Sequence, residues 1–294
     1  VDRNGRLLAT DLEVPSLYAD PAVLIDPDEM IEKLRSVLAD LDEAELGRAF
    51  RDRSRRFVWV RRGLTPELAQ RVHDLGLPGL GFRKELRRAY PLGRVAGHVL
   101  GSVSIDNKGL SGIERHIDET AGIEAVLGAS RSERPPIRLG LDVGVQHGLE
   151  EELRAAMARY GARGAAGLIL SSGSGSIVAA ASLPELDPAR PAEGLDEERL
   201  DKLAAGTFEL GSLFKMFTVA MALDAGQVRL DTLYDVREPL TAGRFTIKDL
   251  HSAGRPLSVA EIFLHSSNVG AGMIALEAGG EAQQAFLARL GLTG

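Results

Sequence analysis

Apolar residues recur at helical spacing in several stretches of the chain. One stretch spans residues 28–41, and its apolar positions are Met30, Ile31, Leu34, Val37, Leu38 and Leu41. A second covers residues 42–50, and a third follows Thr65-Pro66-Glu67, which supplies an N-cap, a proline at the first helical position and an early acid. Residues 149–160 repeat the pattern. Each stretch predicts an amphipathic helix with one face in a core.

Shorter extended runs predict strands at residues 6–10, 15–20, 57–60, 165–170 and 177–181. The Gly/Ser-rich residues 171–176 join the last two of these runs. They lack a P-loop lysine and connect strand to strand, so they predict a hairpin turn rather than a phosphate-binding loop. Residues 77–114 contain several glycines and polar turns, which predict loops and short strands. The mixture of elements indicates an α+β fold.

The length of 294 residues allows two domains, each with its own core. The clearest linker is Arg134-Pro135-Pro136, and residues 138–142 read as a strand that opens a second domain. We therefore expect domains at residues 1–137 and 138–294.

The longest apolar run of the second domain follows Ser212. Its apolar members are Leu213, Phe214, Met216, Phe217, Val219, Ala220, Met221, Ala222 and Leu223. A helix that is apolar on all sides is a buried helix, and Gly226 provides the stop signal. Because the run comes after a helix and a strand hairpin, we expect this helix to pack against a sheet.

The start of this run pairs a serine with a lysine. Ser212 in the first helical turn would lie beside backbone N–H groups that could stabilise an oxyanion. Lys215 would lie one turn further on the same face, so its amine could reach back to the Ser212 oxygen. Phe214 and Met216 would partly desolvate this amine, which lowers its pKa and suits it as a general base. A serine three residues before a lysine is common by chance, so the pair alone is weak evidence.

A second candidate element is Ser266-Ser267-Asn268, between an apolar stripe at residues 257–266 and a helix predicted over residues 269–278. Ser266 and Asn268 could both face a cleft, where the hydroxyl relays a proton and the amide holds a substrate carbonyl. The alternative is ordinary helix capping, which favours the same residue types. Taken alone, capping is the simpler interpretation.

Composition narrows the remaining classes of function. The chain has no cysteine, which excludes disulfides and thiolate chemistry, and its six histidines show no ligand spacing, so we expect no metal and no cofactor. The net charge is −7 and the densest basic stretch, residues 51–56, is short, which argues against nucleic acid. No stretch of about 20 apolar residues predicts a membrane span.

Together, Gly211-Ser212-Leu213-Phe214-Lys215 and Ser266-Ser267-Asn268 resemble the S-x-x-K and S-x-N motifs of the penicillin-binding protein and serine β-lactamase superfamily. The N-terminal half narrows the resemblance to class B penicillin-binding proteins. The motifs that carry it are Asp2-Arg3-Asn4-Gly5, Arg87-Arg88-Ala89-Tyr90-Pro91, Gly97-His98-Val99-Leu100-Gly101 and Gly109-Leu110-Ser111-Gly112-Ile113-Glu114. The resemblance covers essentially the whole chain.

This resemblance implies a non-catalytic pedestal or dimerisation domain at residues 1–137, knitted together by these N-terminal motifs. It also implies a transpeptidase domain at residues 138–294. Ser212 corresponds to the acylated nucleophile and Lys215 to its base. Ser266 corresponds to the serine that protonates the leaving group, and Asn268 to the residue that orients Lys215 and the substrate.

Residues Phe208-Glu209-Leu210-Gly211-Ser212 most resemble the division-type (septal) enzymes, although Leu210 stands where the family commonly has proline. The family's third motif, Lys-Thr/Ser-Gly, has no counterpart in the sequence, since Leu292-Thr293-Gly294 lacks the lysine. The membrane-anchoring helix that the family carries before Val1 is also missing. We therefore expect a truncated chain whose own acylation is very slow or undetectable and whose Ser212 region is poorly packed, rearranged or covered by another chain.

The implied function is peptidoglycan D,D-transpeptidation in septal cell-wall synthesis through a serine acyl-enzyme. The partners implied are stem peptides ending in D-alanyl-D-alanine, β-lactams and membrane proteins of the division complex. The implied location is the inner membrane, with the domains on the periplasmic side. Two alternatives stay open: a D,D-carboxypeptidase or β-lactamase with the same serine chemistry, and a non-catalytic scaffold of the division machinery.

Overall fold

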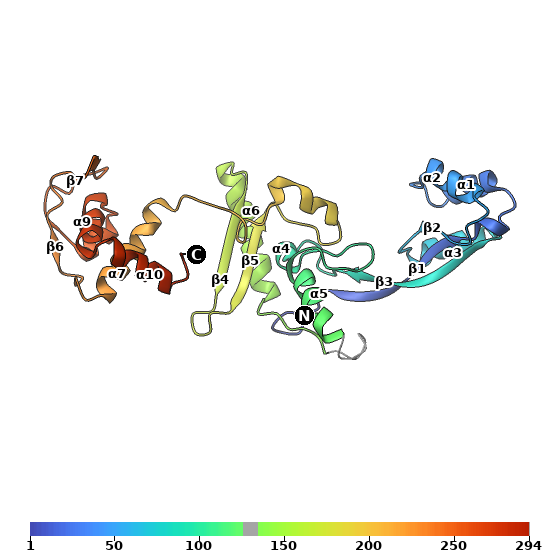
Figure 1. Cartoon of the computed structure of the whole chain (residues 1–294), viewed down its shortest axis with the longest axis horizontal. Coiled ribbons are helices and arrows are strands. Elements are labelled where there is room, and N and C mark those ends of the chain that lie inside the picture. Colours follow the sequence, from blue (N-terminus) through green and yellow to red (C-terminus); the bar gives the residue numbers. More distant parts are fainter. Residues whose placement is uncertain (126–134, 294) are drawn as a thin grey trace. The chain divides into compact units, whose positions relative to one another are not determined.

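The computed structural model describes residues 1–125 and 135–293, with side chains described for residues 1–120 and 135–293. The chain divides into two compact units, Val1–Gly206 and Thr207–Gly294 (Figure 1). No helix in the described ranges is both long enough and apolar enough to cross a bilayer. The elements confirm the predicted α+β class.

The first unit contains a three-stranded antiparallel sheet of order β2-β1-β3. Strand β1 (Thr10–Ala19) pairs along its whole length with β3 (Leu80–Ala89), and β2 (Val58–Arg61) pairs with the end of β1. The prediction of loops and short strands over residues 77–114 is therefore wrong at β3. Most side chains of β3 are exposed or half-buried, so the strand has no clear apolar stripe, and its backbone pairing with β1 defines it.

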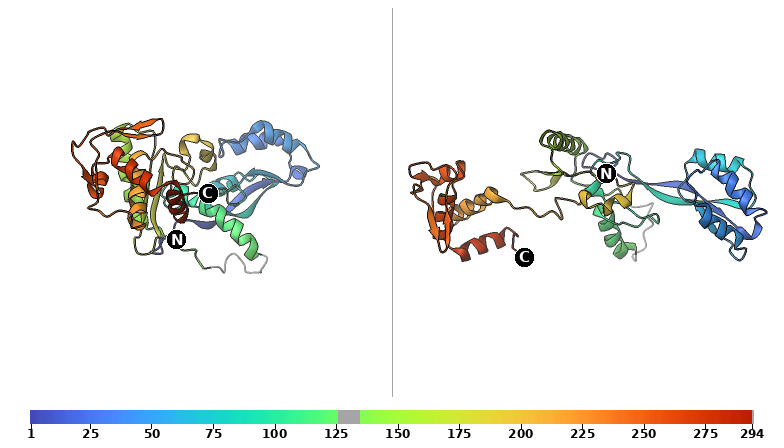
Figure 2. Two further views of the ribbon diagram at one scale, coloured as in Figure 1. Left: turned by 60° about the vertical axis from the view of Figure 1, so that its left-hand side comes forward. Right: turned by 90° about the horizontal axis from the view of Figure 1, so that it is seen from above.

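Three short helices pack against this sheet at one end of the long β1–β3 ribbon (Figures 1 and 2). They are α1 (Pro27–Arg35), α2 (Glu43–Arg51) and α3 (Pro66–Asp74), capped by Asp26, Asp42 and Thr65. Leu17, Leu34 and Phe50 are fully buried in the shared core. The predicted helices are confirmed, although α1 ends at Arg35 and the apolar positions beyond it lie in the following loop.

The N-terminal segment forms a turn around Asp2, which is fully buried. Its carboxylate accepts hydrogen bonds from the backbone N–H groups of Asn4 and Arg6, both at 2.8 Å, and of Val143 at 3.2 Å. Burial acts to raise the pKa of Asp2, but these backbone hydrogen bonds and the charge of Arg6 together lower it. The predicted strands at residues 6–10 and 138–142 are wrong, because most of these residues lie in irregular segments held by isolated backbone bonds.

Two close approaches hold the segment between α4 (Gly97–Leu100) and α5 (Gly112–Ala125). Gly101 has φ +76°, and a Cβ built there would lie 1.9 Å from the carbonyl oxygen of Ser111. Arg88 Nε donates to the buried Glu114 at 2.8 Å. These residues belong to the N-terminal motifs, and their contacts agree with a structural part for them.

Helix α6 (Val143–Tyr160) packs on the hairpin of β4 (Ala165–Leu170) and β5 (Ile177–Leu183). The buried Gln146 donates to Ala180 O at 2.9 Å and accepts from Ala180 N at 2.8 Å, which locks helix to strand. The helix begins before the apolar face predicted from residue 149, because Asp142 caps it. The predicted hairpin is confirmed, with Ser171 N bonded to Ser176 O across the turn.

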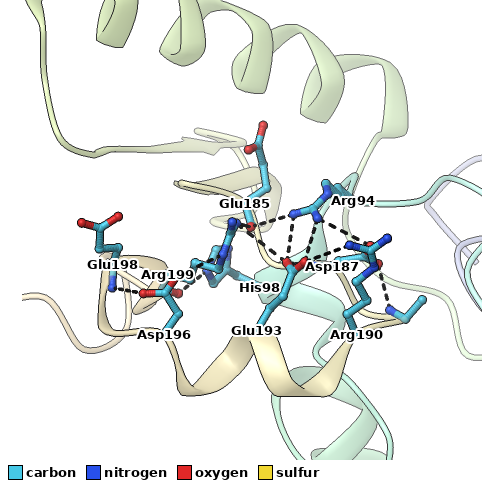
Figure 3. Close-up of polar contacts among 10 residues, drawn as sticks. Arg94, His98, Glu185, Asp187, Arg190, Glu193, Asp196, Glu198 and Arg199 are labelled. Atoms are coloured by element: carbon cyan, nitrogen blue, oxygen red, sulfur yellow. Dashed lines mark hydrogen bonds and ion pairs between the residues drawn. The ribbon is translucent and has the colours of Figure 1, made fainter. Parts of the chain in front are cut away.

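A network of charged side chains binds the segment after β5 to the region of α4 (Figure 3). Arg94 forms a bidentate pair with Glu193 of η3 (Pro191–Leu195), at 2.9 and 3.0 Å. His98 donates from Nε2 to the carbonyl oxygen of Arg199 at 2.7 Å, at the end of η4 (Glu197–Arg199). The predicted linker at Arg134-Pro135-Pro136 falls partly outside the described residues, since Arg134 is not described. The boundary after residue 137 stays a prediction.

The second unit is mainly helical. Its helices are the 3-10 turn η5 (Gly211–Phe214), α7 (Lys215–Asp224), α8 (Val259–Leu264), α9 (Asn268–Ala278) and α10 (Gly280–Arg289). Its short strands pair as β6 (Leu233–Tyr234) with β9 (Leu257–Ser258), and β7 (Leu240–Ala242) with β8 (Phe245–Ile247).

Within its own unit, helix α7 is not buried all round as predicted, and its packing against a sheet stays a prediction. Within its unit it packs mainly on α8, α9 and α10, and its buried residues are Thr218, Val219, Met221 and Ala222. Leu213 and Met216 are 68% and 49% exposed. The apolar run therefore buries only one side within this unit, because these three helices cover that side alone.

Candidate active site

Ser212 lies in the 3-10 turn η5, which leads directly into α7. Gly211 before it has φ +54°, a left-handed conformation that glycine adopts without the cost of a Cβ. The Ser212 side chain is exposed, and among the described residues its hydroxyl has no hydrogen-bond partner. The predicted first-turn position is therefore a 3-10 turn at the entry of the helix.

Lys215 is the first residue of α7 and lies half-buried. Its ammonium donates to the carbonyl oxygen of Ser266 and, at 3.1 Å, to the Ser266 hydroxyl. Burial lowers the pKa of the Lys215 amine, while the Asp249 carboxylate acts in the opposite direction. The lowered pKa has the direction that the flanking apolar residues predicted. The predicted reach of Lys215 to the Ser212 oxygen is not made in this structure, where the ammonium points to Ser266.

Ser266 occupies the left-handed region of backbone space, with φ +55°. It follows His265, the C-cap residue of α8. Such a conformation is uncommon for a residue with a side chain and persists only where neighbouring contacts enforce it. The turn thus places the Ser266 hydroxyl against the Lys215 ammonium, 51 residues away in the sequence.

Of the next two residues, Ser267 caps a helix and Asn268 does not. Ser267 is the buried N-cap of α9 and accepts from Gly270 N at 2.9 Å. Asn268 is exposed, and its side-chain amide donates to the carbonyl oxygen of Lys248 at 2.9 Å. The capping interpretation of the motif therefore holds for Ser267, the middle residue. Asn268 faces Lys248 in this structure rather than Lys215.

Asp249 belongs to the same cluster, and the sequence did not predict it as a site residue. One oxygen of its carboxylate accepts from the backbone N–H groups of Asn268 and, at 3.0 Å, Val269. The other accepts from the Ser267 hydroxyl at 2.7 Å. A single aspartate 18 residues before a serine carries no recognisable spacing, so only the folded chain reveals this contact.

The arrangement suits acyl transfer. It presents an exposed serine at a helix entry and, three residues on, an amine of lowered pKa that is hydrogen-bonded to a second serine hydroxyl, which could pass a proton. No group of three or more histidine, aspartate or glutamate side chains that could hold a metal ion assembles among the residues described.

Two family models match the chain. The Penicillin-binding Protein dimerisation domain matches residues 1–128, and the Penicillin binding protein transpeptidase domain matches residues 165–294. All four candidate residues, Ser212, Lys215, Ser266 and Asn268, fall within the second match.

Several curated proteins resemble the chain along its whole length. The Probable peptidoglycan D,D-transpeptidase FtsI of Caulobacter vibrioides is 40% identical over 293 residues, covering 100% of this chain and 49% of that protein. The Probable peptidoglycan D,D-transpeptidase PenA of Neisseria gonorrhoeae is 33% identical over 315 residues, covering 99% and 53%. The chain therefore spans about half the length of these relatives.

Solved structures agree on the fold. A peptidoglycan synthetase from Bifidobacterium adolescentis matches 99% of the chain and 61% of its own, with a TM-score of 0.66 and 22% identity. Penicillin Binding Protein 2X from Streptococcus thermophilus matches 98% of the chain and 50% of its own, with a TM-score of 0.66 and 19% identity.

Proposed function

The chain belongs to the class B penicillin-binding proteins, with their dimerisation domain followed by their transpeptidase domain. We propose that it is part of a serine D,D-transpeptidase that cross-links peptidoglycan stem peptides during septal wall synthesis. The relatives' names support this choice, since FtsI and PenA are both named peptidoglycan D,D-transpeptidases. As the chain spans about half of those relatives, the activity is proposed for the protein that carries these residues at full length.

In this proposal Ser212 attacks the carbonyl carbon between the two terminal D-alanines. Lys215 in its neutral form accepts the hydroxyl proton, the new C–O bond forms, and the tetrahedral oxyanion is held by backbone N–H groups at the helix entry. Collapse breaks the C–N bond, and Ser266 passes a proton to the departing D-alanine amine. An amine of a neighbouring stem peptide then attacks the acyl-enzyme, forms the cross-link and releases Ser212. Asn268 orients the substrate.

The observation that carries this proposal is the contact between the Lys215 amine and Ser266. It joins the Ser-x-x-Lys and Ser-x-Asn motifs in one cluster, at 3.1 Å from nitrogen to hydroxyl oxygen, although 51 residues separate them in the chain. The lowered pKa of Lys215 supports its use as a base, because a larger fraction of the amine is neutral near pH 7.

Labelling with a fluorescent penicillin tests the proposal. In the full-length protein we expect a covalent adduct that mass spectrometry places on Ser212, and no adduct in the Ser212→Ala variant at unchanged thermal stability. An adduct on the alanine variant at the wild-type rate would contradict the assignment. Analysis of products from a stem-peptide substrate separates the classes: cross-linked dimer indicates a transpeptidase, free D-alanine alone a carboxypeptidase, and no reaction a scaffold.

The location and partners follow from the same family. We infer a membrane-anchored protein with both domains on the periplasmic side, that binds stem peptides and β-lactams at Ser212 and contacts membrane proteins of the division complex. The domain limits that we propose are residues 1–137 for the non-catalytic domain and 138–294 for the part of the transpeptidase domain present here.

A further inference from the structure

We propose that Asp249 is a positioning residue for the serine chemistry, because its carboxylate fixes the Ser266-Ser267-Asn268 turn in the place where it meets Lys215. This inference rests on the proposed acyl transfer at Ser212. Asp249 is not part of either sequence motif, and its contacts connect it to three successive residues at the start of α9.

Both carboxylate oxygens of Asp249 are occupied by the turn. One accepts the backbone N–H groups of Asn268 and Val269, which are unpaired in a helix start without such a partner. The other accepts the Ser267 hydroxyl at 2.7 Å, so the same carboxylate also fixes the side chain that caps α9. A carboxylate at a helix N-terminus is favoured by the helix dipole as well.

The neighbouring residue completes the hold on Asn268. The Lys248 carbonyl oxygen accepts from the Asn268 side-chain amide at 2.9 Å, while Asp249 accepts from its backbone. Residues 248 and 249 therefore fix the main chain and the side chain of Asn268 together. Its proposed substrate contact depends on this orientation.

The backbone of Ser266 explains why the turn needs support. With φ +55° it holds a conformation that costs free energy for a non-glycine residue, so it would relax if its neighbours were free. Both atoms of Ser266 that meet the Lys215 ammonium, its carbonyl and hydroxyl oxygens, depend on that conformation. Release of Ser267 and Asn268 would thus move the group that contacts the proposed base.

Asp249 also acts on Lys215 through its charge. Its carboxylate raises the pKa of the Lys215 amine, against the larger lowering by burial. Removal of the carboxylate should therefore lower the pKa of Lys215 further.

A titration that needs no catalysis tests the effect of the Asp249 charge on Lys215. In the 294-residue chain with ¹³C-labelled lysine, we expect Asp249→Asn to lower the pKa of Lys215 relative to wild type. The matched control is Asp235→Asn, whose carboxylate pairs with Arg237 elsewhere in the same unit and should leave Lys215 unchanged. An unchanged pKa in Asp249→Asn, with Lys215 still resolved, would overturn the electrostatic part of the proposal.

Acylation kinetics test the positioning. In the full-length protein we expect Asp249→Asn to slow penicillin acylation by about ten- to a hundredfold, since small displacements of reacting groups have effects of this size. The rising limb of its pH–rate profile should move to lower pH. Ser267→Ala keeps the carboxylate but loses its hydroxyl contact, so it should slow acylation without moving that limb.

The outcomes separate this inference from the proposed function. A wild-type protein that forms no acyl-enzyme would contradict the function itself, whatever Asp249 does. If the wild-type protein is acylated and Asp249→Asn has the same acylation rate and the same pH profile, the positioning role of Asp249 is contradicted. If Asp249→Asn loses its circular dichroism signal, Ser267→Ala decides: an unchanged rate in that folded variant would likewise overturn the proposal.

Discussion

At the scale of single residues, the proposed chemistry depends on whether the Lys215 amine carries a proton. Lys215 is half-buried at the start of α7, and desolvation disfavours its charged form, so the pKa falls. The neutral amine that a base requires is therefore present from a lower pH than for an exposed lysine. The hydrogen bonds of the Lys215 amine to Ser266 hold it beside that residue. Burial thus lowers the pKa of an amine that these contacts also position.

Lys215→Arg tests this point in the full-length protein. A guanidinium stays protonated and cannot accept the Ser212 proton, although it keeps the charge and could donate to Ser266. We expect acylation by a fluorescent penicillin to slow by about 10²–10⁴-fold, with thermal stability close to wild type. Retention of most of the rate would mean that another group takes the proton.

At the scale of elements, two glycines differ in the space around them: one lies against another backbone segment, and the other lies in open space inside a helix. Gly101 ends α4 with φ +76° and lies against the Ser111 backbone. Gly148 lies inside α6, where an added Cβ would meet nothing within 4 Å. The first glycine permits a close backbone approach, while the second only weakens its helix.

Substitution by alanine should therefore have opposite effects at these two positions. Gly101→Ala combines a disfavoured φ with a backbone clash and should destabilise the protein by about 2–4 kcal/mol. Gly148→Ala should stabilise it by up to about 1 kcal/mol. Chemical denaturation of both variants provides the measurement, and equal effects would refute the distinction.

At the scale of the whole molecule, each of the two units has its own buried core. The helices α1, α2 and α3 and their sheet bury a continuous core in the first unit. In the second unit, the core under α7 leaves Leu213 and Met216 largely exposed. The proposed nucleophile therefore stands at the entry of a helix that buries only one side within its own unit.

The 294-residue chain should react with penicillin far more slowly than the full-length protein. Its sequence contains no Lys-Thr-Gly or Lys-Ser-Gly, and the family resemblance implies that this motif supplies an oxyanion donor and a carboxylate anchor. Loss of one oxyanion donor alone typically costs about 10²–10³ in rate. Stoichiometric labelling of this chain within minutes would contradict the expectation, and labelling of the full-length protein is the control.

Sequence patterns alone determined the features that depend on local chemistry. Apolar spacing placed α2, and the N-cap at Thr65 placed the start of α3, because amphipathicity and capping act within a few residues. The Gly/Ser turn predicted the β4–β5 hairpin for the same reason. The motif residues Ser212, Lys215, Ser266 and Asn268 were also identifiable from spacing and resemblance, and their catalytic roles remain predictions.

Tertiary structure alone decided the features that depend on distant partners. Strand β3 forms through backbone pairing with β1, and its exposed and half-buried residues show no pattern that predicts this pairing. Helix α7 buries one side because α8, α9 and α10 meet only that side within its unit. Asp249 joins the site because folding brings its carboxylate to the start of α9, 19 residues further along the chain. Pairing, coverage and such contacts are set by the whole fold, so the sequence around each residue does not contain them.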